Sequence, residues 1–166
     1  KLNDQELRNA ILVAFAVWVR NMSVKYEHLF ERILKDNKRR AYDKYVLQLT
    51  TFSAFGFQQE ITNSVLNAAY EDDSSVSRQT KKFEEVMEVM SKMIKKHANK
   101  EFKRNFATSL YILLDHMRKE NIAIVDTEMF YKWFIASENR RLGNSKPIMR
   151  TPGGEFRTYD SSCKTC

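Results

Sequence analysis

Turn-forming residues are scarce in this chain of 166 residues, which has only four glycines and two prolines. Gly56 is the only one of them that precedes Gly143. An all-β fold needs frequent turns between short strands, and glycine and proline usually form them. We therefore do not expect an all-β fold. Hydrophobic residues make up 43% of the chain and aromatic residues 12%, which is enough to bury the core of one domain.

Long apolar runs are missing as well. The longest, residues 10–19, ends at Arg20 after ten residues. A membrane-spanning helix needs about 20 apolar residues, so we expect no membrane partner. The chain also begins without the residue pattern of a signal peptide. Because Cys163 and Cys166 stand in the last four residues and cannot link the core, we expect a reducing, intracellular compartment, nuclear or cytoplasmic.

The patterns of enzymes and metal sites are absent too. His28, His97 and His116 lie far apart, and none belongs to an HExxH motif or a Cys/His cluster. Cys163 and Cys166 have the CxxC spacing, but they supply two of the four ligands of a structural zinc site, which another chain would have to complete. Glycine-rich phosphate loops and the GxSxG motif do not occur. We expect no catalytic residue, no metal and no cofactor.

Helical periodicity runs through most of the chain. Apolar residues recur three and four positions apart in seven segments, as in amphipathic helices. These segments are residues 7–22, 26–34, 38–55, 61–69, 83–94, 102–117 and 127–141. The first is apolar on nearly all sides, which predicts a helix at the centre of a bundle. In the last, Phe130, Trp133 and Phe134 are predicted to face inward, and Gly56 is predicted either to end the third helix or to kink it.

The predicted fold is therefore all-α, a helical bundle or helical array of about seven helices with an extended C-terminal arm. Residues 1–143 form the predicted helical domain, with candidate halves 1–70 and 79–143. The segment 71–78 between the halves is polar, acidic and without helical periodicity, as expected of a linker. Residues 144–166 hold both prolines and lack the helical period, so we predict an extended basic arm.

Positive charge exceeds negative charge along the chain, with a net charge of +7. The excess is larger in residues 79–166, which hold seventeen Lys or Arg and eleven Asp or Glu, than in residues 1–70, which hold ten and seven. Such a balance permits nucleic acid, an acidic protein surface or anionic lipid as a partner. Basic residues crowd two short stretches, 35–44 and 92–104.

These stretches contain the candidate RNA contacts, because cationic side chains that neutralise phosphates release counterions and so favour binding. The candidate nucleic-acid-binding residues here are Lys38, Arg39, Arg40, Lys92, Lys95, Lys96, Lys103 and Arg104. The alternative interpretation is a set of solvated helix faces, since the 30% of residues that are charged must lie at the surface somewhere.

The arm carries the most specific local motif. Residues 150–156 read Arg-Thr-Pro-Gly-Gly-Glu-Phe, and they follow the basic end of a predicted helix. This segment resembles the RNA-binding domain of the phosphorylated adaptor for RNA export, which has Arg-Thr-Pro-Gly-Gly-Val-Phe after a helical domain. The resemblance implies that Arg150 and Phe156 contact single-stranded RNA, with Phe156 or Tyr159 stacked on a base. Glu155 departs from the family's pattern, Arg150 stands alone where the family has several arginines, and residues 1–125 show no likeness to it.

We therefore expect a non-catalytic RNA-binding or ribonucleoprotein adaptor module. The alternative is a protein–protein interaction or oligomerisation module that uses a helical groove or the C-terminal arm to bind a protein partner or a second copy. The two hypotheses make different demands on the fold. RNA binding requires basic residues of separate helices to converge in space, whereas a protein-binding module should present an apolar groove larger than a few hundred Å².

Overall fold

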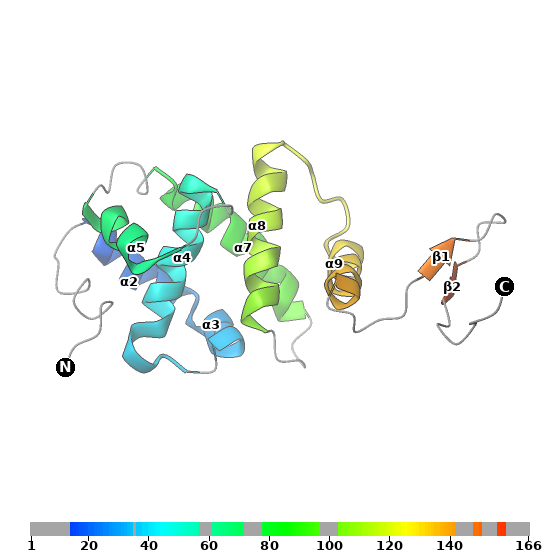
Figure 1. The fold of residues 1–166 in the computed structure, drawn as a ribbon, viewed down its shortest axis with the longest axis horizontal. Coiled ribbons are helices and arrows are strands. Elements are labelled where there is room, and N and C mark those ends of the chain that lie inside the picture. Colours follow the sequence, from blue (N-terminus) through cyan, green and yellow to red (C-terminus); the bar gives the residue numbers. More distant parts are fainter. Residues whose placement is uncertain are drawn as a thin grey trace. The chain divides into compact units, whose positions relative to one another are not determined.

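The computed structural model describes residues 14–34, 36–56, 61–71, 78–96, 103–141, 148–150 and 156–158. Its α-helices, labelled in Figure 1, are α2 (Ala14–Lys25), α3 (Glu27–Leu34), α4 (Ala41–Phe55), α5 (Asn63–Glu71), α7 (Thr80–Lys96), α8 (Arg104–Lys119) and α9 (Thr127–Arg141). The 3-10 turn η1 (Lys38–Arg40) directly precedes α4. The prediction of an all-α helical array is confirmed. The predicted linker 71–78 lies mostly outside the described residues, although Glu71 belongs to α5.

The described part of the arm consists of two short strands. β1 (Ile148–Arg150) pairs antiparallel with β2 (Phe156–Thr158), and Met149 lies opposite Arg157. The backbone is thus extended in both segments, and each supplies hydrogen-bonding groups to the other. Residues 151–155 between them, which carry most of the motif that resembles the adaptor family, lie outside the described residues.

The chain divides into two compact units, residues 1–123 and 124–166. The first unit holds α2 to α8, and the second holds α9 with both strands. Residues of both candidate halves, 1–70 and 79–143, meet within the first unit, where Phe83 of α7 packs against Trp18 of α2. The structural division at 123/124 differs from the boundary at 143/144 that composition suggests.

The centre of the first unit is α4. Nine of its fifteen residues are buried, and it contacts α2, α3, α5, α7 and α8. Two of its buried hydroxyls are satisfied within the helix, since those of Thr50 and Thr51 donate to the carbonyls of Val46 and Leu47 at 2.8 and 2.7 Å. Gly56 ends the helix with a φ of 85°, and its N–H donates to the carbonyl of Phe52 at 2.9 Å. The predicted end of this helix is confirmed.

The predicted central position of the first helix is wrong. On α2, Phe15, Ala16 and Val19 are buried, but Val17 is 41% exposed and Val24 is 71% exposed. A helix that packs on one side of a larger partner buries one stripe only, whatever the composition of its other faces. Valine outside that stripe therefore stays in contact with solvent.

The predicted inward position of Trp133 is also wrong. In α9 the buried residues are Tyr131, Phe134 and Glu138, whereas Trp133 is 55% exposed. Successive helical residues are rotated by about 100°, so Phe134 and Trp133 cannot both lie at the centre of one buried face. The apolar residues of this helix cover two faces, and composition alone does not say which one is buried.

Phe83 connects three of the helices of the first unit. Its side chain is fully buried, and its ring centroid lies 5.3 Å from that of Trp18, 6.3 Å from Tyr26 and 5.8 Å from Tyr111. Aromatic pairs in these tilted and edge-on arrangements contribute beyond the area that they bury. Phe83 therefore fixes α7 against both α2 and α8.

We predict that Phe83→Ala lowers the free energy of unfolding of the chain by about 3–5 kcal/mol, because a large cavity forms where three helices meet. Urea unfolding followed by far-UV circular dichroism measures the change. Lys81→Ala, an exposed position on the same helix, should change it by less than about 0.5 kcal/mol. Equal stability of the two variants would contradict the role given to Phe83.

Candidate functional site

The last turns of α7 lie beside α3. The Arg32 guanidinium donates through Nη1 to the carbonyl of Ile94 at 2.8 Å, and Nε2 of His28 lies 3.2 Å from Oγ of Ser91. The two contacts follow the same order along both helices. The C-terminal part of α7, which carries Lys92, is thereby held against a helix more than sixty residues earlier in the sequence.

The first turns of α4 and α8 meet around Tyr45. The ring of Phe30, from α3, packs against Tyr42 and Tyr45 with centroid distances of 5.8 and 5.7 Å. Tyr45 also contacts α8. Its hydroxyl lies 3.1 Å from Oγ1 of Thr108, and the guanidinium of Arg104 lies 5.5 Å from the centroid of its ring. Tyr45 therefore joins α3, α4 and α8 at one place.

α4 and α8 run in the same direction. Tyr45 contacts Thr108 near the starts of the two helices, and further along both helices Oγ of Ser53 lies 2.7 Å from the hydroxyl of Tyr111. Both N-termini consequently lie at the end of the unit where α7 finishes, the lower edge in Figure 1. Helix N-termini carry partial positive charge, which adds to that of the side chains there.

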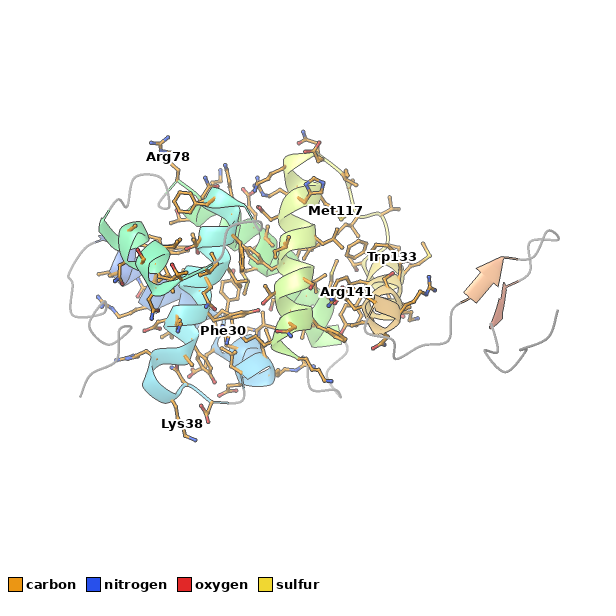
Figure 2. The ribbon with its side chains drawn as sticks, in the orientation of Figure 1. Phe30, Lys38, Arg78, Met117, Trp133 and Arg141 are labelled. Carbon is orange, nitrogen blue, oxygen red and sulfur yellow. The ribbon has the colours of Figure 1, made fainter. Side chains whose placement is uncertain are left out.

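We call this region the basic end, and it is formed by η1, the first turns of α4, the last turns of α7 and the start of α8. Its described cationic side chains are Lys38, Arg40, Lys44, Lys92, Lys103 and Arg104. The structure thus brings together two stretches of basic residues that are separated in sequence by about fifty residues. Figure 2 shows Lys38 pointing away from the helices at this end.

Four of these cations have no partner among the described residues. Within the described ranges, Arg40, Lys44, Lys92 and Lys103 form no ion pair or hydrogen bond through their side chains. Arg40, Lys92 and Lys103 are exposed and Lys44 is half-buried. Lys44, in the first turn of α4, was not among the predicted contacts.

The other two cations have partners. The Lys38 ammonium lies 3.1 Å from the carboxylate of Asp36, and the hydrogen bonds from Lys38 hold the pKa of Asp36 below its ordinary value. Arg104 donates to the side-chain carbonyl of Gln48 and stacks over Tyr45, so its charge is held in place. Among the residues that the structure describes, Glu27 and Glu31 of α3 are further exposed carboxylates near this end.

Several predicted contacts have side chains outside the described set. The backbones of Lys95 and Lys96 end α7, and that of Arg39 lies in η1, so all three positions belong to the basic end. In the second unit, Arg150 lies opposite Phe156 in the two-stranded ladder. The pairing makes these two predicted arm residues direct neighbours across the two strands.

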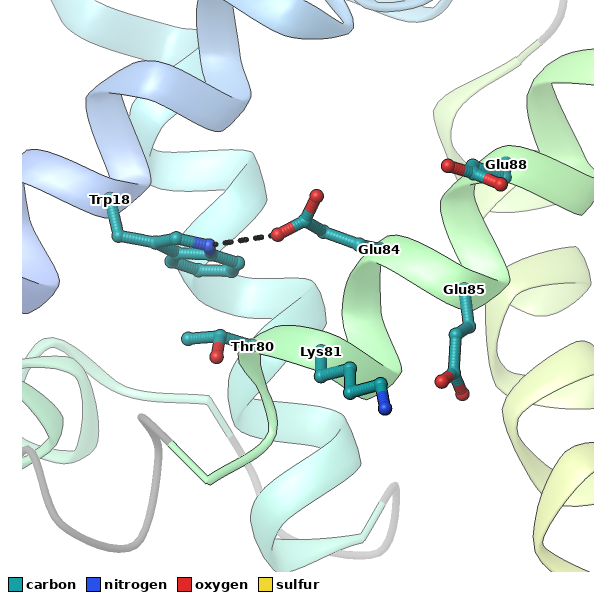
Figure 3. Close-up of a pocket in the computed structure, with 6 residues that line it drawn as sticks. All are labelled: Trp18, Thr80, Lys81, Glu84, Glu85 and Glu88. Atoms are coloured by element: carbon teal, nitrogen blue, oxygen red, sulfur yellow. Dashed lines mark hydrogen bonds between the residues drawn. The ribbon is translucent and has the colours of Figure 1, made fainter.

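The opposite half of α7 is acidic. A hollow of about 310 Å³ is lined by Glu84, Glu85 and Glu88 together with Trp18, Thr80 and Lys81. Figure 3 shows these six side chains. Glu84 accepts hydrogen bonds from the Trp18 indole at 3.4 Å and from the Lys25 ammonium at 2.6 Å, and the latter raises the pKa of Lys25. Residues 80–88 of α7 hold three Glu and two Lys, whereas residues 89–96 hold three Lys and no carboxylate, so the positive charge of this helix lies in its C-terminal half.

A second, smaller hollow of about 140 Å³ is lined by Phe52, Gly56, Tyr111, Ile112, Asp115, His116 and Lys119. Its buried carboxylate, Asp115, is paired with Lys119 at 2.7 Å and with Arg118 at 3.1 Å. Burial raises the pKa of Tyr111, so its hydroxyl stays protonated and is a poor base. Asp115 is therefore engaged in ion pairs rather than poised beside a nucleophile.

No metal-binding group of three or more His, Cys, Asp or Glu side chains occurs in the described part of the chain. In the same residues, no helix combines the length and the apolar character needed to cross a membrane.

Comparison of the chain with protein-family models, with curated proteins and with solved structures finds no match. The resemblance of residues 150–156 to the RNA export adaptor therefore stays a prediction.

Burial of Tyr45 has a consequence for alkaline stability. Its side chain is almost fully buried, and burial raises its pKa to about 12, while the Thr108 hydrogen bond and the Arg104 charge act in the opposite direction. In the unfolded chain the same hydroxyl ionises near pH 10. Because the pKa of Tyr45 is higher in the folded than in the unfolded chain, ionisation above about pH 10 favours the unfolded chain. The contribution of the neutral, buried hydroxyl to the free energy of unfolding is therefore fully present below about pH 10 and is lost as the pH rises toward about 12.

We predict that Tyr45→Phe reduces the loss of stability between about pH 10 and 12 by up to about 3 kcal/mol, since one pKa unit corresponds to about 1.4 kcal/mol. Urea unfolding of both proteins across this pH range measures the difference. The same pH dependence in Tyr45→Phe and in the wild-type chain would show that the Tyr45 hydroxyl does not control it.

Proposed function

We propose that the first unit binds RNA without catalysing a reaction, as an RNA-binding or ribonucleoprotein adaptor module. The observation that carries the proposal is the convergence of the two basic stretches at one end of the unit, joined through Arg104 and Tyr45. Convergence of cations from separate helices is what a phosphate backbone requires and what a set of unrelated solvated helix faces would not produce.

The free cations of the basic end account for the expected salt dependence. If Arg40, Lys44, Lys92 and Lys103 each neutralise one phosphate, the logarithm of the affinity falls with the logarithm of the salt concentration with a slope of about 0.7 per contact for a single strand. Arg104, fixed over Tyr45, and the N-termini of α4 and α8 add positive potential that does not depend on mobile side chains.

Arg40 supports the proposal independently. It precedes α4 with φ 60° and ψ 42°, in the left-handed region that favours glycine. A side chain there costs about 1 kcal/mol relative to a relaxed backbone. Glycine would be the better choice for folding alone, so a free arginine at this position indicates a use for its charge.

The two hollows formed by described residues of the first unit do not favour a protein partner. Both hollows described above are lined partly by charged side chains, and neither is an apolar groove of a few hundred Å². Non-catalytic binding is supported by the described polar clusters, in which Asp115 and Glu84 are engaged in ion pairs rather than placed beside a nucleophile.

We predict that Lys44→Glu combined with Lys103→Glu weakens binding of fluorescent single-stranded RNA by about 100-fold at low salt and lowers the salt slope by about 1.4. Fluorescence anisotropy at two salt concentrations measures both values. The matched control is Lys81→Glu with Lys82→Glu, the same charge change at the other end of α7, which should change the affinity by less than about threefold. Absence of binding by the wild-type chain, or equal effects of the two variants, would overturn the proposal.

A second prediction separates binding from stability. Arg40→Gly should leave the free energy of unfolding unchanged or raise it by up to about 1 kcal/mol, because glycine adopts the left-handed backbone without strain. The same variant should weaken RNA binding several-fold. Urea unfolding and anisotropy titration measure the two effects, and destabilisation of more than about 1 kcal/mol would show that Arg40 serves the fold instead.

A further inference from the structure

One face of α9 exposes apolar and aromatic side chains. Met129 is 67% exposed and Trp133 is 55% exposed, and Ala136 and Arg140 are exposed as well. These four residues are spaced by four, three and four positions, so they form a single stripe along the helix, which we call the outer stripe. A helix that only covers a core would carry polar residues there.

The Trp133 side chain packs against Phe130 on one side. Its ring centroid lies 5.6 Å from that of Phe130, with an angle of 40° between the ring planes. Phe130 is half-buried, so it supports one side of the indole while more than half of Trp133 stays open to solvent. An exposed and supported aromatic ring can accept another flat ring with little loss of side-chain freedom.

The stripe ends in a free positive charge. Arg141 donates to Glu138 through Nε at 3.1 Å and through Nη2 at 2.8 Å, and Lys132 lies 2.9 Å from the carboxylate of Glu128. Arg140, in contrast, forms no ion pair with another residue that the structure describes. It lies two helical turns after Trp133, about 10 Å along the axis and on the same side of the helix.

The size of the stripe argues against a protein partner. A stable protein interface buries about 800 Å² on each side, whereas a fully buried tryptophan contributes about 250 Å² at most. Met129, Ala136 and the fully exposed Val125 extend the apolar surface, but these few residues are far fewer than the roughly 20–30 that each side of a stable interface contributes. One nucleobase, however, is matched in size to one indole. The charge also suits a polyanion, since residues 124–166 hold seven Lys or Arg and five Asp or Glu.

We propose that the outer stripe binds an unpaired base of a single-stranded RNA, with the base stacked on Trp133 and a neighbouring phosphate held by Arg140. The inference rests on the proposed function and narrows its ligand. The basic end binds phosphates of single and double strands, whereas stacking on Trp133 needs a base that is free of its partner.

The test uses the full chain and two labelled probes, a uridine oligomer of about 12 nucleotides, within the usual range of single-strand site sizes, and an RNA duplex of the same length. The uridine oligomer should quench tryptophan fluorescence, and the duplex should not. Trp133→Ala should weaken binding of the oligomer about tenfold and leave duplex binding and the salt slope unchanged. Trp133→Phe, which keeps an aromatic ring, should restore most of the affinity.

Phe55→Ala is the matched control, because Phe55 is an exposed aromatic residue in the first unit, 47% exposed at the end of α4. It should leave the affinity for the oligomer unchanged. The inference is overturned if Trp133→Ala binds the oligomer as tightly as the wild-type chain while the Lys44 and Lys103 double variant does not, and in that case the proposed function still stands.

A different result would identify a protein surface. If Trp133→Ala changes the sedimentation of the chain from an oligomer to a monomer without altering RNA affinity, the outer stripe is a self-association surface and the inference is wrong. If the wild-type chain binds neither probe even at low salt, the proposed function fails and the inference fails with it.

Discussion

The contact around Tyr45 is the one on which the basic end depends. Its ring packs edge-on against Phe30, its hydroxyl reaches Thr108, and Arg104 lies over its face. Phe30 belongs to α3, and Thr108 and Arg104 belong to α8, so one buried tyrosine of α4 connects three helices. Together with the Ser53–Tyr111 hydrogen bond further along both helices, it places the basic residues that precede α4 and those that precede α8 at one end of the unit.

Gathering cations opposes folding, because like charges repel across a surface. Several features limit this repulsion. Lys38 is paired with Asp36, Glu27 and Glu31 lie nearby on α3, and the free cations stay in water rather than entering the core. The acidic residues of α7 lie in its other half, around Glu84. A bound polyanion would remove the remaining repulsion, and for that reason binding and stability of the basic end are expected to be coupled.

The two units use aromatic residues in opposite ways. In the first unit, Phe83 and Tyr111 are enclosed and fix the packing of helices. In the second, the buried face of α9 is made by Tyr131 and Phe134, and Trp133 is left outside beside Phe130. The charged pairs of α9 join residues three or four positions apart. The residues at those distances from Arg140 carry no carboxylate, so Arg140 has no ion pair among the described residues.

Local properties of this chain follow from its sequence alone. The period of apolar residues predicts the helices, because an apolar stripe must be buried, and Gly56 predicts the end of α4, because only glycine takes its φ without strain. The two basic stretches are equally visible. Tertiary structure decided that α4 rather than α2 is central, that Trp133 faces solvent, and that the basic stretches meet. The physical reason is that periodicity reports which residues share a side of one helix, whereas burial and convergence depend on which other helix occupies that side.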